Sequence, residues 1–317
     1  MSTQLVGIAR MASEGAVLEE KRRVAYLEID ARSLIGTCAG RRPMFDWTVN
    51  PYRGCEFGCR YCYARYTHEF MELPVEAFET KIYAKRFDKT IFRRELDRVK
   101  LGQSIAFGSA TDCYQPAERR FKVMRQMLEE VERSARGIRV FLITKSNLIA
   151  RDAALLAALN RHNDVRVNMT ITTLDTALAR KLEPYAPRPD LRLEAVTALA
   201  SAGIETGVAI SPVMPRITDN LENLDALASA AANAGAKYLW AQPLFLKECA
   251  QKVFFPWLAQ EFPALEAKYR AQFRDAAYLK GPYVEFIKQR AHAVRTKYGL
   301  GSRGSEYVPA QMSLFTA

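Results

Sequence analysis

Features that would mark a membrane-spanning or secreted chain are scarce in this sequence. Its 317 residues contain no apolar run that approaches the ~20 residues needed to span a bilayer. The amino terminus has no charged stretch followed by an apolar signal segment. We therefore expect a cytoplasmic protein that makes no contact with a membrane.

Cysteine and histidine are also rare. The chain has six cysteines and three histidines. Cys38, Cys113 and Cys249 stand apart, whereas the other three cysteines lie within eight residues. This spacing does not suggest a disulfide framework, and thiols clustered so closely in a cytosolic protein usually bind metal.

Positive charge is abundant, with a formal net charge of +11. An excess of this size favours a polyanionic partner. Nucleic acid is preferred to an anionic membrane surface because no amphipathic membrane helix is evident in the sequence. Many basic proteins never bind nucleic acid, so charge alone leaves an incidental excess as the alternative.

The pattern of residues divides the chain into four parts, and the largest of them is a single core. Residues 1–44 carry charged and small residues without sustained periodicity, which predicts an extended amino-terminal arm or a mobile leader. Residues 45–250 have the alternating pattern of the core, and residues 301–317 form a tail. Residues 251–300 are aromatic and basic, which predicts a helical extension that caps the core, binds nucleic acid, or does both.

Within the core, short apolar runs rich in β-branched residues alternate with amphipathic stretches. The expected strands are Phe45–Val49, Ser104–Gly108, Ile138–Thr144, Val165–Thr172, Glu205–Ile210 and Lys237–Ala241. The expected helices are Lys89–Val99, Ala117–Ala135, Ala150–Arg161, Asp175–Leu182, Leu191–Ala202 and Asp219–Ala234, with Asp175 and Thr218 as candidate caps. This alternation predicts a parallel sheet of βα units, closed or partly open, with its chemistry at the carboxyl ends of the strands.

The clustered cysteines follow the first expected strand. Cys55, Cys59 and Cys62 have the spacing C-x3-C-x2-C, and Gly54 and Gly58 can adopt the positive φ that lets a backbone curl around an inorganic cluster. Three thiolates would leave one iron of a four-iron cluster open for a small chelating molecule. The motif therefore favours a [4Fe–4S] cluster.

A structural zinc site is the alternative. Zinc would need a fourth ligand, for which His68, Cys38 and Cys113 are the candidates. Zinc motifs usually come as two pairs of ligands, and the sequence contains no second C-x2-C. Iron–sulfur is therefore preferred.

The segment from Asn50 to Arg65, with Tyr61 just before the third cysteine, resembles the signature of the radical S-adenosylmethionine (SAM) superfamily. More narrowly it resembles the spore photoproduct lyase-related branch, whose members are often labelled DNA repair photolyases. Further segments that carry the resemblance are Ser109 to Glu118, Thr144-Lys145 and Gly207 to Pro215.

The resemblance implies an α/β fold, a partial (β/α)6 barrel with a helical carboxyl-terminal extension. It implies that the three cysteines hold a [4Fe–4S] cluster, which reductively cleaves SAM to a 5′-deoxyadenosyl radical that abstracts hydrogen from a substrate. The electron would come from a flavodoxin or a ferredoxin. Whether SAM is consumed or regenerated is not implied.

The resemblance also implies residues that bind SAM. Tyr61 matches the aromatic residue near adenine, and Lys145 resembles a lysine that contacts the SAM carboxylate. Ser109, Thr111 and Asp112 follow the second core strand, where the family places groups around the methionine amino group. Thr172, with Thr170, would add hydroxyl contacts. Asp112 and Glu118 could bind the ribose, hold SAM or cap the helix that begins near Ala117.

One catalytic residue of the branch has no direct match. In spore photoproduct lyase a cysteine at the tip of the second strand returns a hydrogen atom to the substrate radical, and Ser109 stands at the corresponding position here. Cys113, a few residues later, is the candidate substitute, and the alternative for it is a small buried side chain. Tyr63 keeps the tyrosine that follows the third cysteine of the cluster.

Three functions follow from these observations. The first is a radical SAM enzyme that acts on nucleic acid, as in the repair of a lesion, and it is favoured by the resemblance and the charge. The second is a radical SAM enzyme that modifies a peptide or a small metabolite. The third, from another class, is a non-catalytic binding protein stabilised by metal.

The tail contains a candidate docking motif. Gln311, Met312, Ser313, Leu314 and Phe315 resemble the short peptides with which bacterial repair and replication proteins bind the DNA polymerase sliding clamp. The alternative is that Leu314 and Phe315 pack back onto the core as a hydrophobic plug.

Overall fold

The computed structural model describes residues 5–21, 23–38 and 44–302. Its larger sheet has seven strands in the order β11-β10-β9-β8-β7-β4-β3. These are β3 (Ile35–Thr37), β4 (Trp47–Val49), β7 (Ser104–Phe107), β8 (Arg139–Thr144), β9 (Asp164–Thr170), β10 (Glu205–Val213) and β11 (Tyr238–Pro243). Every neighbouring pair from β4 to β11 is parallel, and β3 pairs antiparallel with β4 at the edge.

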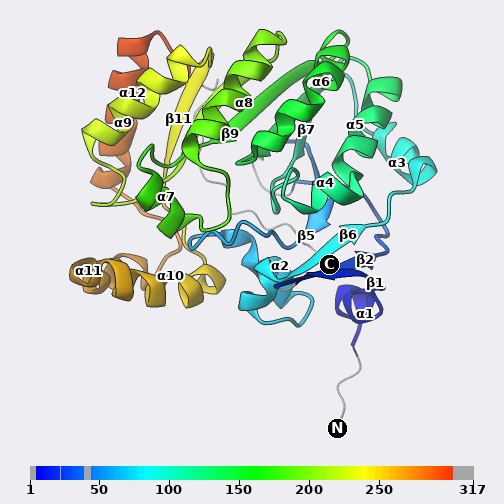
Figure 1. The fold of residues 1–317 in the computed structure, drawn as a ribbon, viewed down its shortest axis with the longest axis horizontal. Helices are drawn as coiled ribbons and strands as arrows, with labels where there is room; N and C mark the ends of the chain where they lie inside the picture. Colours follow the sequence, from blue (N-terminus) through cyan, green and yellow to red (C-terminus); the bar gives the residue numbers. More distant parts are fainter. Residues whose placement is uncertain (1–4, 22, 39–43, 303–317) are drawn as a thin grey trace.

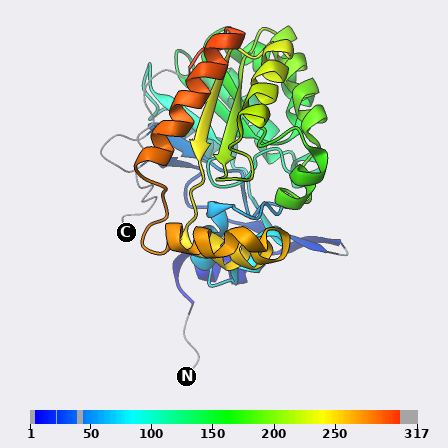
Figure 2. The ribbon, with the colours of Figure 1, turned by 90° about the vertical axis from the view of Figure 1, so that its left-hand side faces the viewer.

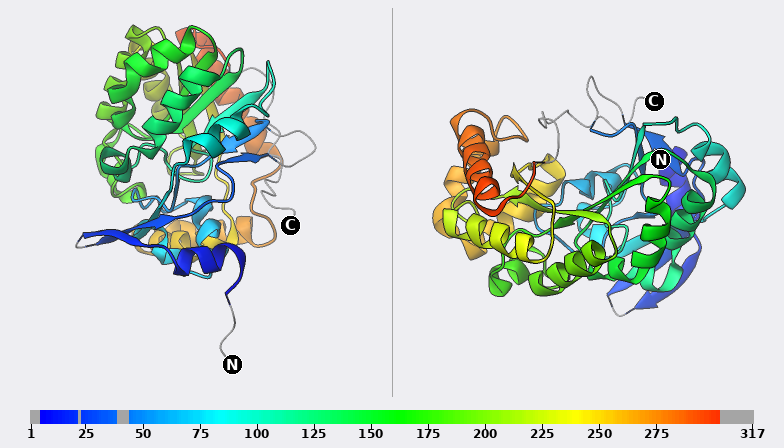
Figure 3. Two further views of the ribbon diagram at one scale, coloured as in Figure 1. Left: turned by 90° about the vertical axis from the view of Figure 1, so that its right-hand side faces the viewer. Right: turned by 90° about the horizontal axis from the view of Figure 1, so that it is seen from above.

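Helices cover the outer face of this curved sheet (Figure 1; Figure 3, right). They are α3 (Lys89–Leu96), α4 (Ala117–Phe121), α5 (Val123–Ser134), η3 (Asn147–Asp152), α6 (Ala153–Asn160), α7 (Thr176–Leu182), α8 (Pro189–Ser201) and α9 (Leu221–Asn233). The apolar faces of these helices and the buried strands form one continuous core. The predicted partial (β/α)6 barrel is therefore confirmed, because each of its six parallel strands coincides with an expected run.

The amino-terminal residues form a second, smaller sheet with the order β1-β2-β6-β5. Its strands are β1 (Val17–Lys21), β2 (Val24–Ile29), β6 (Lys81–Lys85) and β5 (Tyr52–Arg53). Around it lie α1 (Gly7–Ser13), η1 (Tyr63–Arg65), α2 (Tyr66–Glu69) and η2 (Val75–Glu79). In Figure 1 this layer lies below the larger sheet.

The prediction of an extended arm over residues 1–44 is therefore wrong for the described residues. Tyr26 and Ile29 of β2 are buried, and β2 pairs in parallel with β6, which comes more than fifty residues later in the chain. Only two of the six residues of β2 are buried, and they are three residues apart, so the strand lacks the alternation by which the sequence could reveal it. Its hairpin with β1 projects from the molecule (Figure 3, left).

The carboxyl-terminal extension is helical, as predicted. It consists of α10 (Glu248–Glu261), α11 (Pro263–Phe273) and α12 (Pro282–Tyr298), and α10 begins three residues before the expected boundary at residue 251. In Figure 2 the arrowheads of β10 and β11 point towards the layer that contains α10 and α11. α10 contacts η1, η2 and α2, whereas α12 packs against α9 and β11. The extension thus caps the barrel, and no helix in the described part of the chain is long and apolar enough to cross a membrane.

One of the two expected helix caps is observed. The carboxylate of Asp175 accepts hydrogen bonds from the backbone N–H groups of Ala177 and Leu178 at the start of α7. The expected cap Thr218 is wrong, because its hydroxyl is buried and accepts a hydrogen bond from the N–H of Met214. Asn220 caps α9 instead.

Candidate functional site

A cavity of about 250 Å³ lies at the carboxyl ends of the parallel strands. The ends of β7, β8, β9, β10 and β11 form one side of it. Another side is formed by the loop from Cys55 to Cys62, called here the cysteine loop. The extension contributes Tyr278, and the segment before β4 contributes Cys38, Met44 and Phe45. The cavity therefore occupies the place where barrels of this type carry their chemistry.

All three clustered cysteines line this cavity. Cys55 and Cys59 are buried, and Cys62 is partly buried. The loop is held by hydrogen bonds from the N–H of Cys55 to the carbonyl of Phe78 and from the N–H of Cys62 to the carbonyl of Cys59, at 2.9 and 3.2 Å. Three thiols therefore share one wall of the cavity, in a fixed loop.

The thiols are in an environment that disfavours free thiolates. Burial raises the pKa of Cys59 to about 12, although the positive charge of Lys145 acts in the opposite direction. Burial likewise raises the pKa of Cys55 well above its ordinary value. Because thiolates are the metal-binding form of cysteine, these groups fit a centre whose own positive charge stabilises them. The donor set, three thiols on one wall, fits the [4Fe–4S] cluster.

The ligands that a zinc site would need are less well placed. Among the residues that the structure describes, no group of three or more histidine, cysteine or acidic side chains is arranged to hold a single metal ion. The Nε2 atom of buried His68 lies 3.0 Å from the carbonyl of Lys81, and neither His68 nor Cys113 lines the cavity. Cys38, the third candidate for a fourth zinc ligand, does line the cavity. Because the described side chains form no site for a single metal ion, the cluster is still preferred to zinc.

The residues predicted after the second core strand come together on the cavity wall. Thr111 donates a hydrogen bond to the carbonyl of Gly54, which directly precedes the first cysteine, at 2.6 Å. The Oγ atom of Ser109 lies 2.5 Å from that of Thr48 and accepts a hydrogen bond from Asn50. These bonds join the end of β7 to the start of the cysteine loop.

Asp112 and Lys145 lie on adjacent strand ends and interact with each other. The Asp112 carboxylate accepts hydrogen bonds from the hydroxyl of Thr144 and the N–H of Lys145, both at 2.7 Å. Burial alone would lower the pKa of Lys145, but negative charge at Cys59 and Glu183 outweighs it and raises the pKa above its usual value. Lys145 therefore presents a stable positive charge at the cavity.

Two tyrosines, Tyr61 in the cysteine loop and Tyr63 directly after it, also line the cavity. The ring of Tyr61 lies 5.7 Å from the Nζ atom of Lys145, and its hydroxyl donates to the carboxylate of Glu183. The hydroxyl of Tyr63 donates to the backbone carbonyl of Ser109. Both hydroxyls thus fix their rings against the cavity wall.

Other predicted residues lie outside the cavity. Thr172 is buried but does not line the cavity, because β9 ends at Thr170, which takes its place there. Cys113 is fully buried, and its Sγ atom lies 3.8 Å from the carbonyl of Ile143, behind the cavity wall. This position matches the alternative interpretation of Cys113, a small buried side chain.

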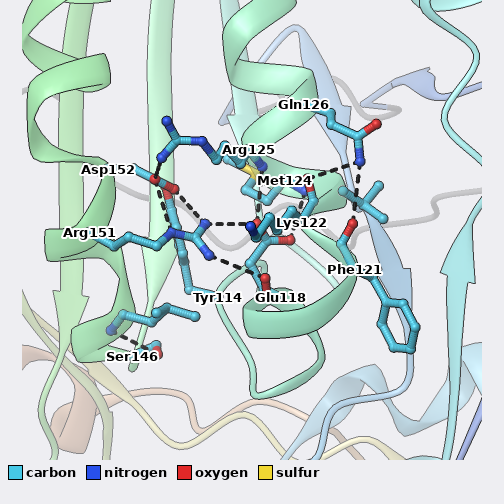
Figure 4. Close-up of polar contacts among 12 residues, drawn as sticks. Tyr114, Glu118, Phe121, Lys122, Met124, Arg125, Gln126, Ser146, Arg151 and Asp152 are labelled. Atoms are coloured by element: carbon cyan, nitrogen blue, oxygen red, sulfur yellow. Dashed lines mark hydrogen bonds and ion pairs between the residues drawn. The ribbon is translucent and has the colours of Figure 1, made fainter. Parts of the chain in front are cut away.

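Glu118 belongs to a structural network behind the site (Figure 4). Its carboxylate accepts hydrogen bonds from the N–H groups of Met124 and Arg125 at the start of α5 and forms an ion pair with Arg151 at 2.9 Å. Asp152 pairs with both Arg151 and Arg125. Glu118 therefore caps the start of α5, whereas the predicted cap was for the helix that begins near Ala117, which contains Glu118 itself.

An aromatic wall of the cavity was not found from the sequence. Phe245 stacks on Tyr278 with ring centroids 4.2 Å apart, and Tyr63 packs against Phe245 at 5.6 Å. Tyr66 extends this wall, with the Nζ atom of Lys247 lying 4.2 Å from its ring centroid. Phe245 and Lys247 follow β11, the last strand, just as Lys145 follows β8. Their position after the end of a strand is the sequence feature that could identify them as residues of the site.

Comparisons with known proteins agree with this geometry. A family model described as the radical SAM superfamily matches residues 49–228. The chain is 34% identical to the uncharacterized protein Rv2578c of Mycobacterium tuberculosis over 281 residues, which cover 86% of this chain and 82% of that protein. It is 28% identical to the uncharacterized protein MJ0683 of Methanocaldococcus jannaschii over 201 residues, which cover 62% of this chain and 71% of that protein.

Solved structures of spore photoproduct lyase have a similar fold. A variant of that lyase gives a TM-score of 0.64 at 16% identity, and the match covers 87% of this chain and 80% of that chain. The structure of the lyase complexed with dinucleoside spore photoproduct gives the same TM-score and coverage. A further structure of a lyase variant contains bound AdoMet together with that dinucleoside.

Proposed function

This chain belongs to the radical SAM superfamily, and we propose that Cys55, Cys59 and Cys62 hold a [4Fe–4S] cluster at which S-adenosylmethionine is cleaved. The observation that carries the proposal is that three thiols, two of them buried and one partly buried, share a cavity with Lys145 and Asp112. The family makes the chain a radical SAM enzyme and implies both cofactors.

The residues around the thiols have properties that suit SAM. When bound, the cluster and SAM supply an organic radical that can abstract a hydrogen atom from the substrate. The charge of Lys145 suits the carboxylate of SAM, and the ring of Tyr61 beside it offers an apolar face for adenine. Asp112, held by Thr144, is available to an ammonium group, and the nearby hydroxyls of Ser109 and Thr111 add polar contacts.

The aromatic wall is the proposed substrate side of the cavity. The aromatic side chains of Tyr63, Tyr66, Phe245 and Tyr278 line it there, and Lys247 adds positive charge. We propose a planar nucleic-acid base, unstacked from its neighbours, as the substrate. The net charge of +11 and the fold shared with a lyase solved with a dinucleoside support this choice over a peptide or small metabolite, which remains the second candidate.

Nucleic acid would also contact the basic extension. Most of its exposed cations have an acidic partner, as Lys288 has in Glu285 and Lys297 in Asp225. Lys268 and Lys280 are exposed on α11 and on the loop before α12, and they are the best-placed candidates for phosphate contacts.

We also propose two protein partners, and neither proposal depends on the basic extension. A flavodoxin or ferredoxin is the proposed electron donor. The clamp-docking motif Gln311-Met312-Ser313-Leu314-Phe315 lies outside the described residues, and clamp binding stays a proposal. It can be tested by titrating a sliding clamp with a peptide spanning residues 307–317 and with its Gln311→Ala, Phe315→Ala variant.

The proposed substrate class can be tested directly. The anaerobically reconstituted protein would be incubated with SAM, dithionite and one candidate at a time: single-stranded DNA, damaged duplex DNA, RNA or a peptide mixture. We expect nucleic acid to stimulate 5′-deoxyadenosine formation and to exchange deuterium with it. Stimulation by peptides alone would replace nucleic acid with the second candidate.

A further inference from the structure

A buried ion pair lies directly behind the cysteine loop. The carboxylate of Glu183 and the guanidinium of Arg192 are 2.5 Å apart, and the two side chains are only 0% and 1% exposed. Glu183 follows α7, and Arg192 lies in the first turns of α8. Removing two charges from water is costly, so a pair in this position indicates a specific role.

Both members of the pair contact the cavity wall. Glu183 accepts a hydrogen bond from the hydroxyl of Tyr61, whose ring lines the cavity. The Nη1 atom of Arg192 donates to the carbonyl of Thr170, another lining residue, at 3.0 Å, and its Nε atom donates to the carbonyl of Pro187. The pair thus connects the cysteine loop to the end of β9.

The segment that carries Glu183 also holds the cysteine loop through its backbone. The N–H of Arg60 donates to the carbonyl of Leu182 at 3.0 Å, and the N–H of Tyr185 donates to the carbonyl of Phe57 at 3.2 Å. Both bonded loop residues lie between the first and third cysteines. The position of the ion pair is therefore fixed relative to the thiols.

The charges of the pair also act on the thiols. Glu183 accepts a hydrogen bond from Tyr61, the residue directly before the third cysteine, so its charge lies close to the thiols. Because the groups are buried, water screens these interactions weakly. A carboxylate there opposes the arrival of an electron at the cluster site, and a guanidinium favours it.

We propose that Glu183 and Arg192 are positioning residues that hold Tyr61 and set the reduction potential of the cluster bound by the three cysteines. This proposal rests on the proposed function, since it requires a cluster. Its basis is the pair's burial, its contacts with Tyr61 and Thr170, and the attachment of its segment to the cysteine loop.

The test measures the midpoint potential of the reconstituted cluster by EPR-monitored redox titration, with iron content as a second readout. Glu183→Gln should shift the potential upwards, because it removes a negative charge. Arg192→Met should shift it downwards, and Arg192→Lys should return it towards the wild-type value. The midpoint potential of the double variant Glu183→Gln/Arg192→Met should lie between the potentials of the two single variants. This result would distinguish an effect of charge from a general loosening of the loop.

Matched controls come from the exposed ion pair on the same segment. Arg188 and Asp190 are 2.6 Å apart and largely exposed, so Arg188→Gln and Asp190→Asn should leave the potential unchanged. If the Arg192→Met variant fails to fold, the potential of the Glu183→Gln variant still tests the proposal. Unchanged potentials, or shifts in the same direction for Glu183→Gln and Arg192→Met, would overturn the proposal. A wild-type protein that binds no four-iron cluster would instead overturn the proposed function.

Discussion

Gly54, the residue before the first cysteine, shows how closely the loop fits its surroundings. Its φ is +81°, and an added Cβ atom would lie 2.7 Å from the carbonyl oxygen of Lys81 and 2.9 Å from that of Phe78. Both neighbours are backbone atoms and cannot move aside easily. Any other residue at this position would suffer both backbone strain from the positive φ and steric overlap of its Cβ atom, so only glycine fits.

Gly54→Ala should therefore lower the free energy of unfolding by about 2–3 kcal/mol and reduce iron loading. The matched control is Gly203→Ala, which has a φ of +78° but nothing within 4 Å of the added atom, so only the backbone strain of about 1 kcal/mol applies. Chemical denaturation of the apoproteins and iron analysis after reconstitution would measure both effects. Equal losses in the two variants would contradict the close fit.

Cys113 gives a second prediction at this scale. Because its thiol is fully buried behind the cavity wall, Cys113→Ala should cost about 1 kcal/mol of stability through lost packing. SAM cleavage and the distribution of substrate products should remain normal. Product analysis by mass spectrometry is the measurement, and a stalled turnover or diverted product radical would restore Cys113 as the hydrogen-atom donor.

The sequence identified the cysteine wall of the site but not its aromatic wall. Cys55, Cys59 and Cys62 are close in the chain, so their spacing alone reveals them. Cys38 and Tyr278 reach the same cavity from segments 240 residues apart, and no local pattern joins them. Thr172 is predicted at the end of the fourth core strand, but β9 ends two residues earlier, at Thr170. Nothing in the sequence marks that end.

At the scale of elements, the parallel strands were predicted well because they are buried. β7 and most of β8 and β9 consist of buried residues, so they stand out as continuous apolar runs. β2 and β3 contain few buried residues, and β2 pairs with β6, which is distant in the chain, so the same reasoning missed them. The capping residues of the helices were partly predictable, since Asp175 is a cap whereas Thr218 is not.

The Asp175 cap provides a test at this scale. Asp175→Ala removes the acceptor for two N–H groups of α7 and should lower the free energy of unfolding by about 1 kcal/mol. Asp175→Asn keeps a side-chain oxygen and should cost much less. Urea unfolding curves of the two variants would show the difference, and equal curves would mean that the cap contributes nothing measurable.

At the scale of the whole molecule, the small sheet and the helices α10 and α11 lie at the carboxyl end of the barrel, whereas α12 runs beside the strands (Figure 2). The extension contributes Tyr278 to the cavity and presents exposed cations. Arg290 and Arg295 are only partly exposed, and Arg290 donates to the carbonyl of Asp219, which holds α12 against the segment before α9. Exposed lysines are therefore the better probes of nucleic-acid binding.

We expect DNA or RNA binding that weakens steeply with salt, with a log–log slope of about 0.9 for each phosphate contact. Lys268→Glu/Lys280→Glu should flatten this slope. Lys100→Glu is the control, because Lys100 is exposed before β7, at the opposite end of the strands from the cavity. Fluorescence anisotropy between low and physiological salt would measure the slopes, and salt-independent binding would argue against phosphate contacts.

The central claim concerns the three cysteines, and metal analysis of the purified protein tests it most directly. Under anaerobic conditions we expect about four irons per chain and a broad absorption at about 400 nm. Cys55→Ala, Cys59→Ala and Cys62→Ala should each abolish the cluster and the formation of 5′-deoxyadenosine from SAM, whereas Cys249→Ala should leave both intact. Stoichiometric zinc in place of iron, or a cluster that survives the loss of any of the three cysteines, would contradict the claim.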